Sequence, residues 1–237
     1  MLNVFDPYSI RRNLREVQAR IAAAEARSGR AKGAVRLVAV TKTVAPEAVR
    51  ALWEAGAREF GENRVQELLR KAEALADLPI RWHMIGSVQT NKVGKLLAAE
   101  GLAMLHSLDS LRLAEALNEA ALKRGCDIEA LVEVNVSGEA SKHGLPQAAV
   151  QELLRAAGRL ERLRITGLMT MAPYGEDPEQ ARPVFAGLRK LKESLREGMP
   201  PNVRLEHLSM GMSNDFEAAI EEGADIVRIG TALFHNM

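Results

Sequence analysis

The sequence predicts a single (β/α)8 barrel, also called a TIM barrel, formed by residues 1–237 as one domain. Eight short apolar runs alternate with stretches of helical periodicity, and no linker or low-complexity segment interrupts them. One more helical stretch precedes the first run, while little sequence follows the last. We therefore expect the N-terminal helix to complete the outer ring of helices. An open Rossmann-like sheet is the alternative, but no G-x-G-x-x-G motif follows any of the runs.

The eight predicted strands are short, apolar and bounded by polar or glycine residues. The first, residues 36–41, has the order Arg-Leu-Val-Ala-Val-Thr, which is typical of a strand that is buried on both faces of a parallel sheet. The other seven share this brevity and are predicted at residues 59–63, 81–86, 104–107, 128–136, 163–170, 203–210 and 225–230.

The predicted helices are recognised by apolar residues at steps of three and four. The N-terminal helix, from about residue 8 to residue 28, carries Ile10, Leu14, Val17 and Ile21 on one face, with arginines and glutamates opposite. Pro46 suits the first turn of the helix after the first strand. Similar periodicity follows the later strands.

The composition excludes several classes of function. A net charge of +1 argues against electrostatic binding of nucleic acid or of an anionic membrane as a main role. No apolar stretch approaches the ~20 residues of a membrane span, and no secretory signal is visible at the start. The single cysteine, Cys126, allows no internal disulfide and suits a reducing compartment. We expect a cytoplasmic protein and, because no dimerisation arm is visible, a monomer.

In a barrel, the residues that follow each strand meet at one mouth, where chemistry is placed. Small polar groups dominate there and acidic groups are scarce, which argues against a paired-carboxylate site or a magnesium site. The residues expected at the mouth are Lys42, Asn63, Gly86, Ser87, Asn135, Ser137, Met169, Thr170, the turn 209–213, Arg228, Gly230 and Thr231.

Two cations stand out in this set. Lys42 directly follows the first strand, and a lysine at the rim of an apolar core can lose its proton and attack a carbonyl. A solvated surface lysine is the alternative. Arg228 lies in the apolar run 226–229 and needs a partner if it is buried. That partner is either a carboxylate, such as Glu133 or Glu206, or a ligand, and we favour the ligand.

Two turns indicate an anion site. Residues 209–215 form a turn of small residues that opens a helix, and Gly230-Thr231 follows the last strand. The loops after strands seven and eight are the usual phosphate position in this fold. The alternative is that Ser213 or Asn214 only caps the helix that it opens.

Three histidines lie in predicted strands, but they do not indicate a metal. His83, His106 and His207 show no local ligand spacing such as H-x-H or H-E-x-x-H. We expect core or hydrogen-bonded histidines and no metal site.

A lysine and a phosphate cradle in one barrel fit two chemistries: a Schiff-base aldolase that acts on a sugar phosphate, or a pyridoxal 5′-phosphate (PLP) protein. Five motifs resemble those of the pyridoxal phosphate homeostasis protein family, and the resemblance spans nearly the whole chain. The motifs are AVTKT (39–43), FGENRVQE (60–67), WHMIG (82–86), LSMGMS (208–213) and VRIGT (227–231).

The resemblance implies a fold like the N-terminal barrel of alanine racemase and PLP held on Lys42 as a Schiff base. It implies that Arg228 faces the pyridine nitrogen, and that Asn63 and Met169 line the ring. It also implies a possible second PLP site at Lys142. The residues that it places around the phosphate are Ser209, Ser213, Gly230 and Thr231.

The family is regarded as non-catalytic, holding PLP in vitamin B6 homeostasis and delivering it to PLP-dependent apo-enzymes. The sequence gives a reason to expect this, because a racemase of this type takes a catalytic tyrosine from a second domain. Here only seven residues follow Gly230, and the two tyrosines, Tyr8 and Tyr174, lie away from the predicted strand ends. We therefore expect no catalytic activity; the alternative is an amino-acid racemase or another Schiff-base enzyme.

Overall fold

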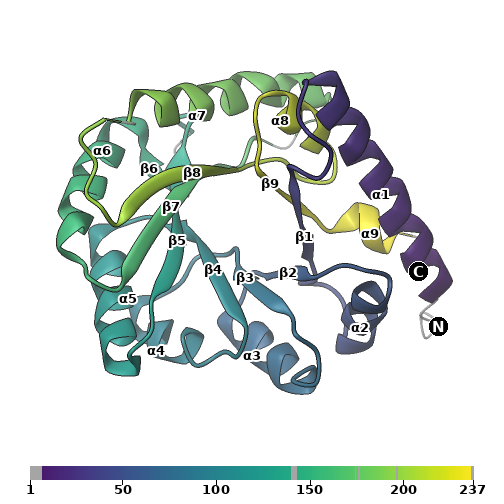
Figure 1. The fold of residues 1–237 in the computed structure, drawn as a ribbon, viewed down its shortest axis with the longest axis horizontal. Coiled ribbons are helices and arrows are strands. Elements are labelled where there is room, and N and C mark those ends of the chain that lie inside the picture. Colours follow the sequence, from purple (N-terminus) through teal and green to yellow (C-terminus); the bar gives the residue numbers. More distant parts are fainter. Residues whose placement is uncertain (1–6, 140–142, 174, 176, 196, 236–237) are drawn as a thin grey trace.

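The computed structural model describes residues 7–139, 143–173, 175, 177–195 and 197–235, and it shows a closed parallel barrel (Figure 1). All eight predicted strands are present, and the last of them pairs with the first. Their bounds, in the order in which they pair, are β1 (Arg36–Val40), β2 (Glu59–Glu62), β3 (Arg81–Met84), β4 (Leu102–Leu108), β5 (Ile128–Asn135), β7 (Leu163–Met169), β8 (Val203–Ser209) and β9 (Ile226–Ile229). The predicted (β/α)8 fold class is confirmed.

One short strand was not predicted. β6 (Leu145–Pro146) pairs with the end of β5 through Val134 and Asn135 and forms a small ladder outside the barrel. Two residues, one of them a proline, carry no alternating pattern that could have shown it.

Helices surround the barrel and shield it from solvent. They are α1 (Pro7–Arg27), α2 (Pro46–Glu54), α3 (Val65–Ala74), α4 (Val93–Leu96), α5 (Leu111–Arg124), α6 (Gln147–Ala156), α7 (Arg182–Ser194), α8 (Phe216–Glu221) and α9 (Thr231–Phe234). Within the described residues, short 3₁₀ helices directly adjoin α4, α6 and α7; they are Thr90–Lys92, Ala157–Arg159 and Pro178–Ala181. No helix among the residues described has both the length and the apolar character that crossing a membrane requires.

The N-terminal helix completes the ring of helices, as the sequence predicts. α1 packs along α8 and α9 on one side and α2 on the other (Figure 1). Asn13, which is fully buried, donates from Nδ2 to the backbone oxygens of Leu233 and His235. These bonds tie α1 to the last described residues of the chain and close the barrel at the seam between β9 and β1.

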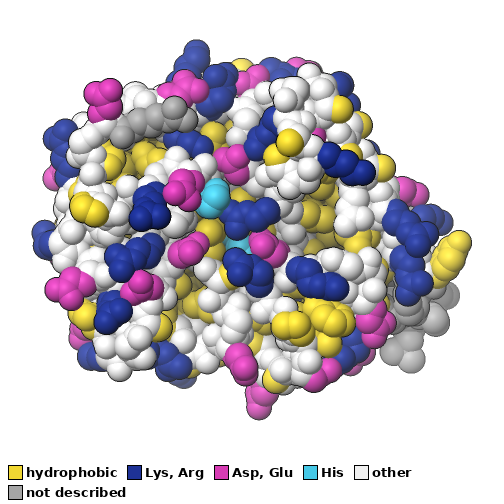
Figure 2. Space-filling model, viewed as in Figure 1, with side chains coloured by type: hydrophobic (Ala, Val, Ile, Leu, Met, Phe, Trp, Pro, Cys, Tyr) yellow, Lys and Arg dark blue, Asp and Glu magenta, His cyan; other side chains and the backbone are white. Residues whose placement is uncertain are grey.

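The main core lies between the barrel and the helices, and the barrel interior holds both apolar and buried polar side chains. An apolar cluster inside it consists of Val38, Met104, Leu131, Met169 and Ile226. Inward-facing side chains of a strand alternate with outward-facing ones. Figure 2 shows side chains of both charges, with histidine among them, gathered over the middle of the barrel on the face that it draws.

Candidate functional site

Lys42 lies immediately beyond β1, at the carboxyl ends of the strands, and its side chain is exposed. Thr41, the residue before it, is fully buried and donates its backbone N–H to Gly61 O at 2.9 Å. This placement fits the expectation that Lys42 lies at the rim of an apolar core, and its reactivity stays a prediction. The buried part of the segment ends at Thr41, and Lys42 is the first residue to emerge from it.

A buried ion pair, which was not predicted from the sequence, lies behind Lys42. Lys71 of α3 is 1% exposed and Glu62 at the end of β2 is 0% exposed, and Lys71 Nζ is 2.5 Å from Glu62 Oε1. Lys71 also donates to the backbone oxygen of Thr41 at 2.6 Å, and Thr41 Oγ1 donates to Glu62 Oε1 at 2.6 Å. These three contacts fix the backbone that carries Lys42. Lys71 shares the buried face of α3 with Leu68 and Ala72, a spacing that could have shown it.

Arg228 of β9 projects into the barrel interior, where it is 4% exposed. Its Nη1 donates to Ser209 Oγ at 2.6 Å and its Nη2 donates to the backbone oxygen of Thr170 at 3.0 Å. Burial lowers the pKa of Arg228 to about 10, and the nearby carboxylates of Glu133 and Asp215 oppose that shift. The guanidinium therefore keeps its charge at neutral pH.

No carboxylate forms an ion pair with Arg228 within the described part of the chain. Glu133 is buried on β5 and makes no ion pair with Arg228, although its charge acts on Arg228 at longer range. Glu206 is exposed on β8. Burial also raises the pKa of Glu133. The two carboxylates considered from the sequence are thus not the partners of Arg228; neutral oxygens are.

Two histidines continue from Ser209 across the interior. His106 Nδ1 lies 3.0 Å from Ser209 Oγ, and His106 Nε2 lies 2.8 Å from His83 Nδ1. Both rings are fully buried, and burial lowers the pKa of each below the usual value. The prediction that these two histidines are hydrogen-bonded residues of the interior is confirmed. His207 is only half-buried and lies outside this series of contacts.

The two predicted anion-binding turns meet at Ser213. Its Oγ accepts hydrogen bonds from the backbone N–H groups of Gly230 and Ala232, both at 3.3 Å. Ser213 does not cap α8, the helix that its own turn opens, because α8 begins after Asp215 without a side-chain cap. The hydroxyl instead joins the turn after β8 to the start of α9.

Gly211 gives the first of these turns its shape. Its φ is +94°, in the left-handed region, and a Cβ there would lie 2.6 Å from Ala219 Cβ and 2.9 Å from Phe216 Cα. Its carbonyl oxygen accepts from Arg228 N at 3.0 Å. Only glycine fits this conformation and this close approach, which brings the turn against β9.

The remaining predicted site residues are placed as follows. Asn63, half-buried, follows β2, and its backbone approaches Gly86 so closely that a Cβ on Gly86 would lie 2.3 Å from Asn63 O. Met169 ends β7 and is fully buried in the interior cluster. Thr231 is exposed as the first residue of α9. Lys142 lies outside the described residues.

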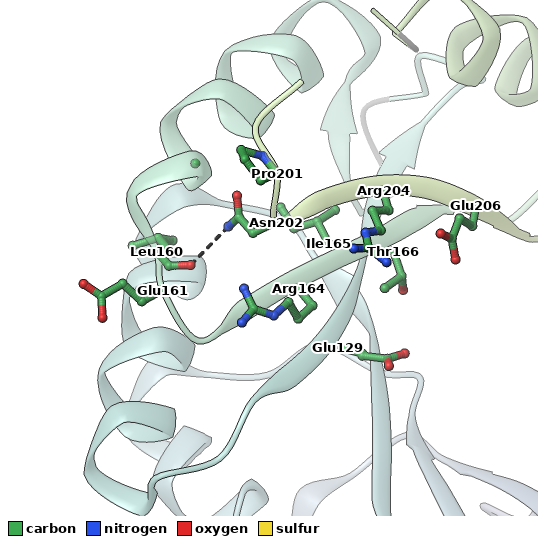
Figure 3. Close-up of a pocket in the computed structure, with 11 residues that line it drawn as sticks. Glu129, Leu160, Glu161, Arg164, Ile165, Thr166, Pro201, Asn202, Arg204 and Glu206 are labelled. Atoms are coloured by element: carbon green, nitrogen blue, oxygen red, sulfur yellow. Dashed lines mark hydrogen bonds between the residues drawn. The ribbon is translucent and has the colours of Figure 1, made fainter. Parts of the chain in front are cut away.

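A groove of about 530 Å³ lies at the opposite end of the barrel, where β5, β7 and β8 begin (Figure 3). Side chains of both charges line it, including Arg164, Arg204 and Glu161. Asn202 bridges its wall by donating to the backbone oxygens of three residues, of which Leu160 is drawn in Figure 3. Its lining shares no residue with the mouth around Lys42. Among the residues described, no group of three or more His, Cys, Asp or Glu side chains is arranged to hold a metal.

Fold and site together define a barrel of the alanine racemase type, and the family model described as "Alanine racemase, N-terminal domain" matches residues 6–236. A "Pyridoxal phosphate homeostasis protein" of Aquifex aeolicus is 47% identical over 221 residues, which are 93% of this chain and 95% of that protein. The chain belongs to the pyridoxal phosphate homeostasis protein family, as its motifs predict.

Two solved structures are similar over nearly their whole length. The crystal structure of an unknown protein from Bifidobacterium adolescentis has a TM-score of 0.91 and 40% identity, covering 98% of each chain. PipY of Synechococcus elongatus, solved with PLP bound, has a TM-score of 0.78 and 36% identity, covering 90% of this chain and 99% of PipY.

Proposed function

We propose that this chain binds PLP through Lys42 as a Schiff base and serves as a carrier in vitamin B6 homeostasis. In this role it protects the reactive aldehyde and passes PLP to PLP-dependent apo-enzymes. The observation that carries the proposal is the placement of three features at the carboxyl ends of the strands: the exposed amine of Lys42, the Arg228 guanidinium and the turns joined by Ser213. That a relative of 36% identity is described with PLP bound supports it.

The residues present fit the phosphate of PLP. Small side chains and hydroxyl donors suit a phosphate. Ser213 Oγ accepts from the backbone N–H groups of Gly230 and Ala232, so the Ser213 hydroxyl proton stays available to donate to a phosphate oxygen. A Cβ on Gly230 would lie 3.2 Å from Val40 O, so a larger residue would crowd this approach. We propose that Ser213, Gly230 and the exposed Thr231 hold the phosphate.

Ser209 and Met169 take supporting roles in this proposal. Ser209 is 0% exposed and its hydroxyl is already committed to Arg228 and His106, so we assign it to holding Arg228 and not to contacting the phosphate. Met169 packs beneath the site inside the barrel. Asn63, at the rim after β2, remains available to line the ring.

When bound, PLP supplies an aldehyde that condenses with amines and a ring that can accept electrons. Arg228, as the residue that would face the ring nitrogen, would limit the second property, because a guanidinium can donate a hydrogen bond but does not give up its proton. At neutral pH Arg228 stays charged, since its pKa is about 10. The site therefore favours reversible holding through Lys42 over chemistry that builds negative charge on the ring.

An enzyme, either an amino-acid racemase or another Schiff-base enzyme, is the second candidate, because the barrel type and the exposed amine of Lys42 would serve either. A racemase also needs a second acid–base group opposite the lysine. Tyr8 cannot serve, because it is exposed on α1 in the outer ring, and Tyr174 lies outside the described residues. Exchange of amino-acid α-protons in heavy water at ~1 s⁻¹ or faster would favour the enzyme and contradict the carrier.

Titration of the purified protein with PLP tests the proposal. We expect an absorbance band near ~420 nm, as is general for PLP imines, that Lys42→Ala abolishes. Lys95→Ala is a matched control, because Lys95 is also exposed but lies on α4 in the outer layer. A protein that takes up no PLP, or a Lys42→Ala variant that keeps the band, would refute the proposal.

A further inference from the structure

We infer that Glu59, His83 and His106 are positioning residues for the PLP site, because they fix Ser209 as a hydrogen-bond acceptor for Arg228. We call the series Glu59–His83–His106–Ser209 the interior relay. It spans the barrel from the amino end of β2, through β3 and β4, to the carboxyl end of β8. The inference deepens the proposed function and rests on it, but its structural part can be tested on the protein without PLP.

The interior relay is continuous at hydrogen-bond distance. His83 Nε2 lies 3.1 Å from Glu59 Oε2, but the pair lacks hydrogen-bond geometry and is an electrostatic contact between two buried atoms. The next contacts are His83 Nδ1 to His106 Nε2 at 2.8 Å and His106 Nδ1 to Ser209 Oγ at 3.0 Å. The two rings meet edge to face, with an interplanar angle of 76°.

The donors and acceptors of the interior relay can be assigned from its ends. Arg228 is a donor only, so Ser209 Oγ accepts from it, and the Ser209 hydroxyl proton is free to go to His106 Nδ1. His106 then carries its proton on Nε2 and donates to His83 Nδ1. His83 in turn carries its proton on Nε2, facing the Glu59 carboxylate, which is an acceptor. Each contact thereby has one donor and one acceptor.

The reverse direction fails at both ends. If His106 donated from Nδ1 to Ser209, then His83 would donate from Nδ1 and would present an unprotonated Nε2 to Glu59. Burial raises the pKa of Glu59, but the charges of Arg36 and Arg81 lower it, and Arg81 Nε donates to Glu59 Oε1 at 3.2 Å. With Glu59 ionised, two acceptors would face each other at 3.1 Å. The Ser209 proton would also have no acceptor among its contacts in the described residues.

Burial is the main reason that both histidines stay neutral, and nearby positive charges act in the same direction. Arg36 and Arg81 lower the pKa of His83 further. The pKa of His106 is lowered further by His83 and then by Arg228, Arg36 and His207. Glu59 alone favours a charged His83, and the desolvation of a fully buried ring outweighs it. A neutral ring has one donor and one acceptor, as the assigned direction requires.

The consequence for the site is a fixed guanidinium. Ser209 Oγ and Thr170 O accept hydrogen bonds from the two terminal nitrogens of Arg228. Two acceptor oxygens therefore hold the plane of the guanidinium. A Ser209 hydroxyl that rotated its proton toward Arg228 would oppose this hold. The interior relay prevents that rotation, because the Ser209 proton is donated to His106. Glu59 thereby contributes to the orientation of Arg228 at the mouth of the barrel.

Nitrogen-15 NMR of the histidine rings in the PLP-free protein tests the assigned direction. We expect both His83 and His106 to be neutral and protonated on Nε2 between pH 7 and pH 8, above the ordinary histidine pKa of about 6.5. An Nδ1-protonated or doubly protonated ring at either position would overturn the inference. This readout does not depend on whether the protein binds PLP.

Three variants test the link to the site. Glu59→Leu removes the terminal acceptor, and we expect mixed tautomers at His83 and PLP affinity weaker by about tenfold, the effect of losing one net hydrogen bond. Glu59→Gln keeps an acceptor oxygen and should restore both. Arg81→Gln is the matched control, because it removes the other ion-pair partner of Glu59, at 3.2 Å, outside the interior relay.

The outcomes separate the two proposals. The inference is overturned if Glu59→Leu keeps the wild-type tautomers or if Arg81→Gln alters them. It is also overturned if Glu59→Leu shifts the tautomers but leaves the PLP affinity unchanged. If Glu59→Leu does not fold, the wild-type tautomers and the affinity of Glu59→Gln still decide it. If the wild-type protein shows the expected tautomers but takes up no PLP, the proposed function fails while the direction of the interior relay stands.

Discussion

Replacement of Lys71 by methionine tests whether the buried ion pair behind Lys42 holds that segment in place. The variant keeps the length and packing of the side chain but removes its charge and both of its hydrogen bonds. Glu62, which is 0% exposed, would keep only the Thr41 hydroxyl as a partner, because its other oxygen, Oε2, has none among the described residues. The Thr41 carbonyl would lose its 2.6 Å bond from Lys71 as well.

The expected loss of stability is large for one substitution. Breaking one side of a buried ion pair costs about 3–5 kcal/mol, since it leaves an uncompensated charge in the interior. For a protein of this size, that loss lowers the melting temperature by roughly 6–20 °C. Because the same bonds fix the backbone at Thr41, we also expect PLP uptake by Lys42 to weaken in the variant that remains folded.

A double-mutant cycle measured by urea unfolding at pH 7 is the assay. The double variant Lys71→Met with Glu62→Gln removes the orphaned charge but keeps an acceptor for Thr41, so it should be more stable than Lys71→Met alone. Lys95→Met, on the exposed face of α4, is the matched control and should change stability by less than about 0.5 kcal/mol. A loss below about 1 kcal/mol in Lys71→Met, or additive effects in the cycle, would refute the reasoning.

Two further predictions concern stability. Burial lowers the pKa of His83 and His106. As the pH falls through about 6.5, the unfolded chain therefore binds protons that the folded chain excludes, and stability decreases; from pH 7 to 5.5 we expect a loss of up to about 2.5 kcal/mol in urea unfolding. An unchanged free energy of unfolding would contradict this prediction. Gly211→Ala should lower the free energy of unfolding by roughly 2–4 kcal/mol, because it combines strain at φ +94° with a clash against Ala219. Gly33→Ala is the control, at φ +81° with nothing within 4 Å of its Cβ, and should cost only about 1–2 kcal/mol. Equal losses in the two variants would show that the clash is absent.

The fold could be predicted because local patterns determine most of it. The run of four apolar residues before Thr41 can only be a short, doubly buried strand, and the repeated alternation of such runs with helical periodicity leaves few topologies. The placement of α1 followed from a counting argument, since a ring of helices needs one beside β9 and β1. The strand β6 was not predicted, because the pairing of a two-residue strand depends on its position in the tertiary structure and not on local sequence.

The candidate site was only partly predictable, because many of its contacts join residues that are far apart in the sequence. Lys42 and Arg228 stand out because one follows an apolar strand directly and the other is a charged residue within one. The contact between His106 and Ser209 joins residues 103 positions apart, and no spacing rule encodes it. Lys71 was overlooked because a lysine on an amphipathic helix is usually exposed, although its position between Leu68 and Ala72 marks the buried face. The exposure of Lys42 could not be read from the pattern, because periodicity does not show where a buried segment ends.

Borohydride reduction of the PLP-loaded protein, followed by peptide mapping, tests the central claim most directly. Reduction makes a Schiff base permanent, so the modified lysine identifies the residue that holds PLP. We predict loss of the band near ~420 nm and one equivalent of pyridoxyl group on the peptide that contains Lys42. Lys142, the lysine considered for a second PLP site, provides a comparison within the same digest. An unmodified Lys42 in a protein that has taken up PLP would contradict the account.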